Sequence, residues 1–567
     1  MANIAASAEK ELFLPRTVEL LRGYGSGLFI KDFIAGLTVG IVALPLAMAF
    51  GIASGVTPDR GLFTAIVAGF LISLLGGSRF QIGGPTGAFV VIIFNVIYKH
   101  GYDGLVVTTL IAGVMLLIFG LCRLGTLIKY IPHPVTTGFT TGIGVLIFSS
   151  QMKDFLGLTM GTVPPEFFEK WEAYAHNVGT VNPKALTVGV FALTIILLVR
   201  RVIPRIPGPV VGVVLASAAV WAFGLDVETI GSKFGGVPNA LPSLTIPSVT
   251  LAQIRILLPD AMTIALLAGI ESLLSCVVAD GMTGDKHNSN VELAAQGVAN
   301  IASVLFGGIP ATGAIARTVT NIRSGGQTPV AGMIHAVVLV AFIMFLAPLA
   351  SYIPLASLAA VLLVVSWDMS EVHKFLRVFR APKSDSSVML LTFGLTVVID
   401  LTVAVYVGVL LAAILFMRRM SEVTAITSCE LAEMAKAAGK DVKDLVIPDG
   451  VRVYEIDGPF FFGVADRFQG VLTFMEQQPR IFILRMRKVS TVDSTGVNAL
   501  EIFVRRCKAR GIHVLLTGVR DRARMVFERM GTEELIGSDN FCENIDAALS
   551  RAKLLLETES RKEDTSS

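Results

Sequence analysis

Long runs without a charged residue alternate with short charged segments over most of the chain. A helix needs about 20 mainly apolar residues to cross a bilayer, and runs near that size recur before a polar stretch at 226–258. The pattern therefore predicts seven membrane-spanning segments ahead of that stretch. The uncharged runs cover 33–58, 61–78, 80–98, 104–122, 130–152, 185–199 and 206–225.

A second set of runs follows the polar stretch. The run 324–367 is about twice the length that one crossing needs, so it predicts two crossings around Pro348 and Pro354. If 293–316 and its continuation past Arg317 also form two, the second set numbers seven. The remaining runs are 261–279, which contains one Glu, 386–399 and 401–417.

The positions of Lys and Arg predict the orientation. These residues are enriched on the cytoplasmic side of membrane proteins, and a cytoplasmic N-terminus places most of those at the segment ends on that side. Both termini are then cytoplasmic, which requires an even number of crossings, and fourteen meets the requirement. The residues are Arg79, Arg123, Lys129, Arg200, Arg201, Arg205, Lys374, Arg377, Arg380, Lys383, Arg418 and Arg419.

Charge composition separates a membrane body from a tail. Of the 91 Asp, Glu, Lys and Arg, 44 lie in residues 421–567 and 47 in residues 1–420. The first 420 residues are therefore the membrane body, and the last 147 are the tail.

The remaining composition excludes several classes of protein. A net charge of +3 does not indicate the basic surface that binds nucleic acid. The five cysteines show no metal-ligand spacing, so we expect no metal or other cofactor. The charged first 30 residues contain no signal-peptide pattern, so we expect the first spanning segment to direct membrane insertion.

One motif occurs twice, in the third segment of each set. Residues 83–88 read Gly-Gly-Pro-Thr-Gly-Ala, and residues 307–314 read Gly-Gly-Ile-Pro-Ala-Thr-Gly-Ala. Gly and Pro interrupt a helix here, and paired interruptions in two halves indicate the midplane site of an inverted-repeat transporter. Seven segments between the copies give them opposite topology. The alternative is that small residues only allow close helix packing.

Glu271 lies near the centre of an apolar run, where a carboxylate is costly unless it is protonated, paired or hydrated. It is therefore a candidate for ion coupling, and a structural hydrogen bond is the alternative. Ser275, one helical turn later, is expected to share a proton or ion with it. Arg317 follows the second Gly/Pro motif, where helix N-termini and a guanidinium suit an anion. Its alternative role is an anchor at the cytoplasmic end of a half-helix.

The tail alternates strands and helices, which indicates a small α/β domain. Predicted strands are 451–456, 481–486 and 513–517, and predicted helices lie around 464–477, 496–509 and 520–530. Residues 491–496 (Thr-Val-Asp-Ser-Thr-Gly) begin a helix, which Asp or Ser explains as an N-cap. The tail shows no catalytic constellation, so we expect no enzyme. Residues 557–567 are polar, so we expect them to be disordered.

These motifs together resemble the sulfate permease (SulP) family. The resemblance rests on residues 44–51 (Leu-Pro-Leu-Ala-Met-Ala-Phe-Gly), 83–87, 271–274 (Glu-Ser-Leu-Leu), 280–284 (Asp-Gly-Met-Thr-Gly) and 316–318 (Ala-Arg-Thr), and it extends over nearly the whole chain. Among bacterial members the chain looks similar to proton-coupled C4-dicarboxylate uptake carriers, through residues 152–158 and 280–284. The resemblance implies H⁺-coupled uptake of succinate or fumarate; a sulfate or bicarbonate transporter, an anion channel and a signalling scaffold remain alternatives.

The resemblance implies a core domain and a gate domain with the anion held between segments three and ten. Arg317 matches the arginine behind that site. In a sodium-coupled bicarbonate branch, Asp stands at the position of Glu271, Thr at that of Ser275 and a hydroxyl residue at that of Ile315. Because Ile315 offers no oxygen to a cation, we expect H⁺ on Glu271 as the coupling ion rather than Na⁺. By position the anion pocket comprises Leu46, Phe50, Thr86, Gly313, Ala314 and Ile315.

The tail resembles a STAS domain, in which a hydroxyl in the Asp-Ser-Ser/Thr-Gly loop is phosphorylated. By position that hydroxyl is Thr495; the N-cap reading stays open. The resemblance implies a homodimer in the lipid of the inner (cytoplasmic) membrane, and a cytoplasmic regulatory protein as a partner of the tail. The expected parts are a cytoplasmic segment at 1–29, a transmembrane domain at 30–420, a cytoplasmic STAS domain at 421–556 and a disordered end at 557–567.

Overall fold

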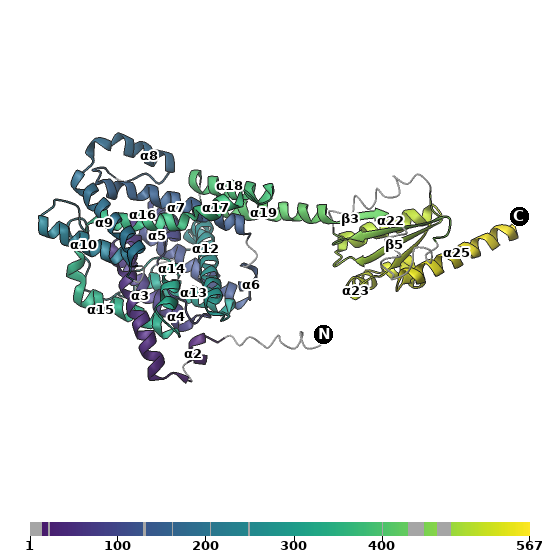
Figure 1. The fold of residues 1–567 in the computed structure, drawn as a ribbon, viewed down its shortest axis with the longest axis horizontal. Helices are drawn as coiled ribbons and strands as arrows, with labels where there is room; N and C mark the ends of the chain where they lie inside the picture. The colour runs from purple at the N-terminus through teal and green to yellow at the C-terminus, as the bar shows by residue number, and fades with distance from the viewer. Residues whose placement is uncertain are drawn as a thin grey trace. The chain divides into compact units, whose positions relative to one another are not determined.

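The computed structural model describes two compact units, Met1–Ala412 and Ala413–Ser567 (Figure 1). The sequence predicted the boundary at 420/421, a few residues later, because helix α19 (Leu401–Val423) is continuous across it. The described residues are 14–20, 23–128, 132–161, 163–203, 206–247, 250–399, 401–428, 447–461 and 478–566.

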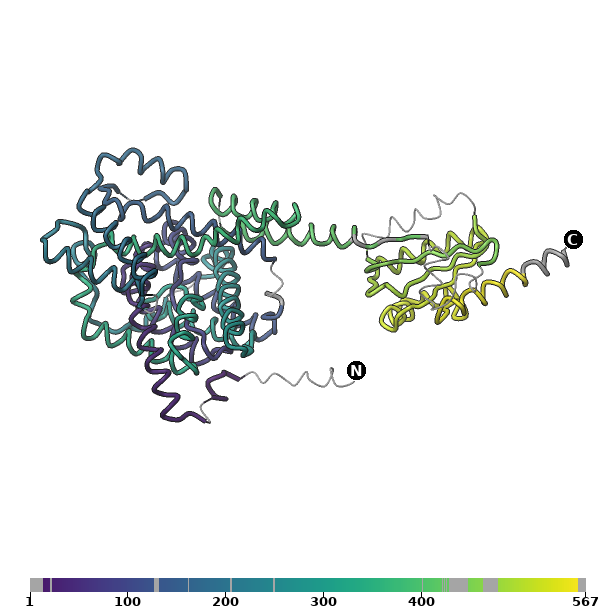
Figure 2. Tube along the Cα trace, in the orientation of Figure 1, coloured from purple at the N-terminus to yellow at the C-terminus, as the bar shows by residue number. Residues whose placement is uncertain are grey.

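The first unit is helical, and its main helices follow the predicted runs (Figure 2). The first set comprises α3 (Ser26–Ala53), α4 (Pro58–Leu75), α5 (Gly87–Leu121), α7 (His133–Leu156), α9 (Pro183–Val202) and α10 (Gly208–Phe223). The second set comprises α12 (Leu251–Thr283), α13 (Ser289–Leu305), α14 (Ile315–Arg323), α15 (Val330–Ala350), α16 (Leu355–Ser370), α18 (Lys383–Val398) and α19. Short elements join them: α2 (Arg16–Leu20), α6 (Gly125–Ile128), α8 (Phe167–His176), a 3₁₀ turn (Val178–Thr180), α11 (Ile230–Phe234) and α17 (Val372–Val378).

Fourteen segments result because α5 contains two. It bends at Gly101, whose φ of 69° lies in the left-handed region that glycine tolerates. In the described part of the chain, eight helices are long and apolar enough to span a membrane by length and composition. The other segments are shorter or less apolar, and α14 is half of an interrupted segment. The two predicted sets of seven are therefore recovered, each with a broken third segment.

The helices pack as two bundles. Extensive contacts join α3, α4 and α5 with α12, α13, α14 and α15, and another set joins α7, α9 and α10 with α16 and α18. Each bundle thus draws corresponding helices from both repeats. The bundles meet mainly where α3 contacts α16 and α10, and where α5 contacts α7. This division matches the predicted core and gate domains, respectively.

The second unit is an α/β domain built on a five-stranded sheet. Strand β3 (Ala425–Ser428) is antiparallel to β4 (Val451–Asp457), and β4, β5 (Ile481–Lys488), β6 (His513–Thr517) and β7 (Phe541–Cys542) run parallel in that order. Helix α22 (Ser494–Ala509) and α23 (Asp521–Arg529) cover one face, and α25 (Ile545–Ser566) covers the other. Helix α24 (Thr532–Ile536) and a 3₁₀ turn (Ser538–Asn540) complete the domain.

The predicted elements of the tail agree with this fold where they can be compared. The three predicted strands and the helices around 496–509 and 520–530 are present, whereas the helix around 464–477 falls outside the described residues. The expectation of disorder at 557–567 differs from the structure, in which α25 continues to Ser566; Ser567 lies outside the described residues. A helix already packed on the sheet through Ala548 and Ala552 extends at little cost once nucleated.

Glu455 of β4 is a buried carboxylate in the tail, with a side chain 7% exposed. Its oxygens lie 2.9 Å from both Arg487 Nε and Lys488 Nζ and 3.9 Å from Arg485 Nη1. Burial raises the pKa of this carboxyl, but the hydrogen bonds from Lys488 and Arg487 outweigh it, so its pKa lies below the ordinary value. The ionised form is therefore the one that holds β4 against β5.

We expect Glu455→Gln to destabilise the tail by roughly 1–3 kcal/mol at neutral pH, because three cations lose their shared partner. A carboxylate whose pKa is lowered on folding adds stability above its unfolded pKa of about 4.3. This contribution disappears as the pH falls from there through the lower folded-state pKa. Hydrogen exchange of peptides from 451–457 and 481–488 in the full-length protein measures the effect. Asp457→Asn, at a 56% exposed side chain that also contacts Lys488, is the control; an equal effect there would contradict the prediction.

Candidate functional site

The two Gly/Pro motifs meet as a short antiparallel strand pair inside the core bundle. Strand β1 (Gly83–Gly84) pairs with β2 (Thr312–Gly313), Gly83 opposite Gly313 and Gly84 opposite Thr312. The Ala314 N–H extends the pairing by donating to the Ile82 carbonyl at 2.8 Å. Backbone groups freed by the helix breaks therefore satisfy each other, as the membrane interior requires. The close-packing alternative does not account for this pairing.

A helix begins directly after each strand. Helix α5 starts at Gly87 after Thr86, and α14 starts at Ile315 after Ala314; neither start has a side-chain cap. The first N–H groups of a helix have no partner within it, and they carry the positive end of its dipole. Because the preceding strands pair with each other, the two helix starts lie at the same site. This arrangement suits a bound anion.

Glu271 of α12 lies beside the start of α5. Its side chain is half-buried, and the Thr86 hydroxyl donates to its Oε2 at 3.3 Å. Among the described residues no Lys, Arg or His forms a salt bridge with it. Glu271 therefore connects α12 directly to the start of α5.

Ser275 does not share a contact with Glu271 in this structure. It is fully buried, and its hydroxyl donates to Thr318 Oγ1 at 3.1 Å, which also accepts from the Ile82 N–H at 3.1 Å. The one-turn spacing correctly places Ser275 on α12 near the site, but Thr318 of α14 engages its hydroxyl. Ser275 therefore supports the strand pair rather than contacting the predicted coupling residue.

Arg317 lies behind the strand pair. It is 2% exposed, and its Nη2 donates to the Pro85 carbonyl at 3.2 Å. Its Nη1 stands so close to Gly84 that a Cβ there would lie 2.4 Å away. A membrane-interface anchor needs exposure to headgroups, so the buried Arg317 does not fit that alternative. The guanidinium instead supports the Gly-Pro segment and adds positive charge near both helix starts.

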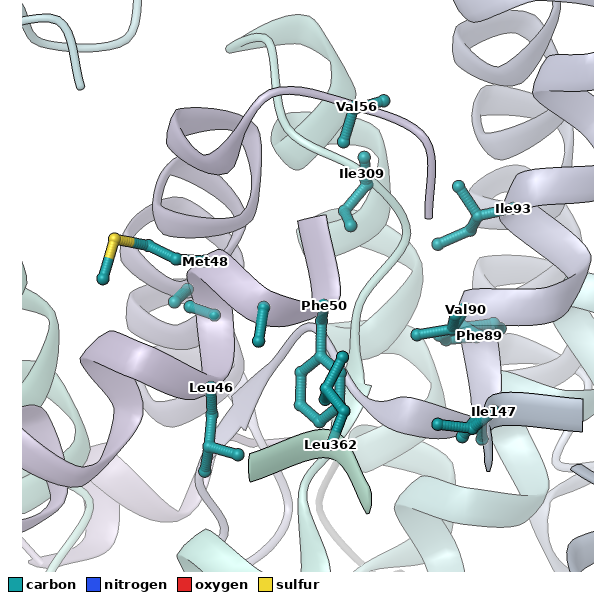
Figure 3. Packing of buried hydrophobic residues seen from close by; sticks show 14 of the residues in the cluster. Leu46, Met48, Phe50, Val56, Phe89, Val90, Ile93, Ile147, Ile309 and Leu362 are labelled. Atoms are coloured by element: carbon teal, nitrogen blue, oxygen red, sulfur yellow. The ribbon is translucent and has the colours of Figure 1, made fainter. Parts of the chain in front are cut away.

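Apolar side chains from both bundles close one side of the site. Phe50 and Leu46 of α3 are 6% and 8% exposed, and Figure 3 shows Phe50 packed beside Leu362 of α16. A Cβ on Gly87 would lie 2.7 Å from Met369 Sδ, 3.3 Å from Ile147 Cδ1 and 3.4 Å from Phe50 Cε1. The core and gate bundles therefore touch at the first residue of α5.

The remaining predicted pocket residues differ in exposure. Gly313 and Ala314 are buried, whereas Ile315 is 40% exposed. The side chain of Ile315 therefore extends away from the packed strand pair.

Three polar residues that support the site were missed from the sequence: Ser272, Gln81 and Glu292. Ser272 accepts from the Gly313 N–H at 3.0 Å and lies 2.8 Å from Thr312 Oγ1. Gln81 donates to the fully buried Glu292 at 3.0 Å. Ser272 directly follows Glu271 in the motif 271–274, and Glu292 directly precedes the uncharged run 293–316. The sequence therefore contained a signal for both residues, but Glu292 served only to mark where a membrane segment begins.

In the tail, Asp493 caps α22 by accepting from the Gly496 N–H at 2.7 Å. Thr495, the second residue of that helix, is exposed. The N-cap interpretation of this loop is therefore confirmed, while phosphorylation of Thr495 stays a prediction. No group of three or more His, Cys, Asp and Glu within the described part of the chain is placed to hold a metal ion.

Comparisons with known proteins match both units. The model of the sulfate permease family matches residues 29–392, and that of the STAS domain matches residues 443–548. "Putative sulfate transporter YvdB" of Bacillus subtilis (strain 168) is 42% identical over 93% of this chain and 98% of its own length. Bicarbonate transporter BicA of Picosynechococcus sp. is 30% identical over 92% of this chain and 94% of its own.

Two solved structures resemble this one. SLC26A9 has a TM-score of 0.84 at 18% identity, over 99% of this chain and 95% of that one, which shows the shared fold. The transmembrane domain of a cyanobacterial bicarbonate transporter, BicA, has a TM-score of 0.61 at 31% identity, over 69% of this chain and 98% of that one. The fold of the whole chain, with both units, is therefore shared with SLC26A9, and the fold of the helical unit with BicA.

Gly313→Ala tests whether the strand pair holds the site. The new Cβ would lie 2.1 Å from Gln81 Nε2 and 3.1 Å from Ser272 Cα, so we expect loss of about 1–3 kcal/mol of stability through overpacking. Thermal unfolding in detergent measures the change, and uptake assays should show reduced transport. Gly394→Ala is the matched control because no atom lies within 4 Å of its Cβ position. Equal behaviour of the two variants would refute a tightly packed pair.

Proposed function

Since this chain belongs to the sulfate permease family, we propose that it is a secondary active transporter of a small inorganic oxyanion, sulfate or bicarbonate, coupled to H⁺. The observation that carries the proposal is the pair of uncapped helix starts fixed by β1 and β2, with Glu271 hydrogen-bonded to Thr86 at one of them. An anion gains from both dipole ends without needing a second charged ligand.

The substrate class rests on the site and on the relatives. Full-length relatives are named for sulfate and bicarbonate, and the expected C4-dicarboxylate finds no support in them. Gly313 and Ala314 bring no polar side chain to the site, so the polar features of α14 there are its first backbone N–H groups and the buried Arg317. Such donors suit a compact oxyanion. We therefore favour the inorganic anions over succinate or fumarate.

Protonation of Glu271 explains how transport is coupled. A carboxylate at membrane depth without a cationic partner is costly in its charged form, so binding a proton is the direct way to neutralise it. The proton lies close to the anion because Thr86 contacts Glu271 and precedes the first turn of α5. Ile315 supplies no oxygen ligand, which favours H⁺ over Na⁺.

Movement of the two bundles would give alternating access. The strand pair, Glu271 and Arg317 all belong to the core bundle, so an anion bound there would move with it. The side chains that surround Gly87, which are Phe50 from the core bundle and Ile147 and Met369 from the gate bundle, are apolar, so they can slide or separate without breaking a hydrogen bond. The transporter would act in the inner membrane, as a homodimer with cytoplasmic termini, and the tail would bind a regulatory protein.

Glu271→Gln should abolish proton coupling. In proteoliposomes we expect labelled sulfate uptake to rise with an inward proton gradient in the parent, and to lose that response in the variant, because Gln cannot exchange a proton. Glu292→Gln is the control: this buried carboxylate is held by Gln81, Gln296 and the Gly77 N–H. We expect it to lower stability while the remaining transport keeps its pH response. Sodium-dependent, pH-insensitive uptake in the parent, or full activity in Glu271→Gln, would contradict the coupling.

Competition of unlabelled anions with labelled sulfate for uptake identifies the class of substrate. We expect unlabelled sulfate or bicarbonate to reduce labelled sulfate uptake at lower concentrations than succinate or fumarate, because the site presents backbone donors to one compact anion. Stronger competition by the dicarboxylates would overturn the substrate proposal. Flux that neither saturates nor runs uphill would indicate a channel instead.

A further inference from the structure

A cavity of about 370 Å³ lies in the helical unit outside the site described above. Its walls come from both bundles: the link between α3 and α4, the first half of α5, the end of α7, α8 and α11. The orientation predicted from Lys and Arg places all these segments toward the outer face of the membrane. The cavity is therefore an outward-side recess between the core and gate bundles.

Three lysines and one aspartate line this recess. Two of the lysines have partners: Lys233 lies 3.1 Å from Asp154 Oδ1, and Lys153 donates to the carbonyls of Met160 and Gly161 at 3.0 and 2.9 Å. The third is Lys170 of α8. The net charge of the lining is thus positive, and its remaining unpaired ammonium belongs to Lys170.

Lys170 is 5% exposed, which is rare for a lysine without a partner. Among the described residues no hydrogen bond or ion pair reaches its Nζ, and the ammonium lies 6.0 Å from the centroid of the Phe94 ring. Burial lowers the pKa of Lys170 to about 8, with Glu166 opposing the change. A buried ammonium that lines a cavity needs an anion.

Polar side chains beside the lysine complete a binding surface. Asn95, Ser150 and Gln151 also line the recess, and Gln151, itself 5% exposed, donates to Ser150 Oγ at 2.8 Å. Helix α8 is held in place because Trp171 Nε1 donates to Ser149 Oγ of α7 at 3.1 Å. The ammonium therefore lines the same recess as amide and hydroxyl groups that can orient an oxyanion.

The inner end of the recess is apolar. Val90 and Leu146 line it and belong to the same packed cluster as Phe50 and Ile147; Figure 3 labels Val90, Phe50 and Ile147. These side chains separate the recess from the start of α5, where the candidate transport site lies. An anion bound in the recess would therefore be separated from the candidate transport site by apolar side chains of both bundles.

We propose that this recess is a second anion-binding site, in which Lys170 binds a small inorganic oxyanion on the outer side of the transport site. Its role in uptake rests on the proposed function, whereas anion binding by itself does not. A positive recess raises the local concentration of an anion and its rate of entry. In this proposal Lys170 captures the anion from outside, and the starts of α5 and α14 bind it during transport.

The fluorescence of Trp171, the neighbour of Lys170, reports binding directly. Trp221→Phe and Trp367→Phe remove the chain's two other tryptophans, which are 74% and 68% exposed. In that background we titrate the full-length protein with sodium sulfate at constant ionic strength. We expect a saturable change, weakened about tenfold or more by Lys170→Met because a charge-assisted contact is lost.

Two variants make the test specific. Lys184→Met removes an exposed lysine at the start of α9, outside the recess, and should leave the titration unchanged. Thr86→Val alters the transport site and should also leave it unchanged. Unaltered sulfate affinity in Lys170→Met, no saturable change in the parent, or loss of the signal in Thr86→Val would each overturn the proposal.

The pH dependence and the kinetics provide independent readouts. Sulfate affinity should fall as the pH rises from 7 to 9 in Lys184→Met but not in Lys170→Met. In uptake assays Lys170→Met should raise KM several-fold and leave kcat unchanged. If the parent binds sulfate at Trp171 but does not transport it, the proposed function fails and this site stands. The other titratable groups that line the recess are Tyr98 of α5, Lys153 and Asp154 of α7 and Lys233 of α11. Glu166 directly precedes α8 and interacts with Lys170, and α8 itself also carries Glu169, Glu172, Tyr174 and His176.

Discussion

The helical unit depends on satisfying backbone hydrogen bonds at membrane depth without a continuous helix. Each Gly/Pro motif alone would leave N–H and C=O groups unpaired at a cost of several kcal/mol per group. Pairing β1 with β2 satisfies them mutually, and the Ser272 and Thr318 hydroxyls accept from adjacent N–H groups. Two repeats that are far apart in sequence are thereby joined at one point. The strand pair also fixes the positions of the starts of α5 and α14, which follow it.

The core bundle consequently carries the chemistry, and the gate bundle mainly supplies apolar surface to the site. Glu271, Thr86 and Arg317 lie in the core bundle, with contacts to each other or to the strand segment. Ile147 and Met369 from the gate bundle approach the same region without polar contacts to it. This asymmetry suits the proposed relative motion, because the hydrogen bonds that hold the candidate site lie within the core bundle.

Periodicity and composition predicted most of the fold, since membrane helices and the Gly/Pro breaks have strong local signals. The partners of individual side chains were less accessible. One-turn spacing put Ser275 near Glu271, but the contact was taken by Thr318 of a different helix. Gln81 and Glu292 form a pair across more than 200 residues, and Lys170 lies in a short amphipathic segment typical of a solvated loop. These features depend on tertiary packing, which no local pattern encodes.

The paired helix starts also separate two properties of a binding site: its preference for negative charge and its discrimination among anions. The backbone field of α5 and α14 favours negative charge whatever the shape of the anion, so the preference for anions over cations is part of the fold itself. In the proposed mechanism, discrimination among anions falls to side chains at the edge of the candidate site, such as Phe50 and Ile315. A change of substrate can then arise through a few substitutions, while the architecture that recognises charge is inherited intact.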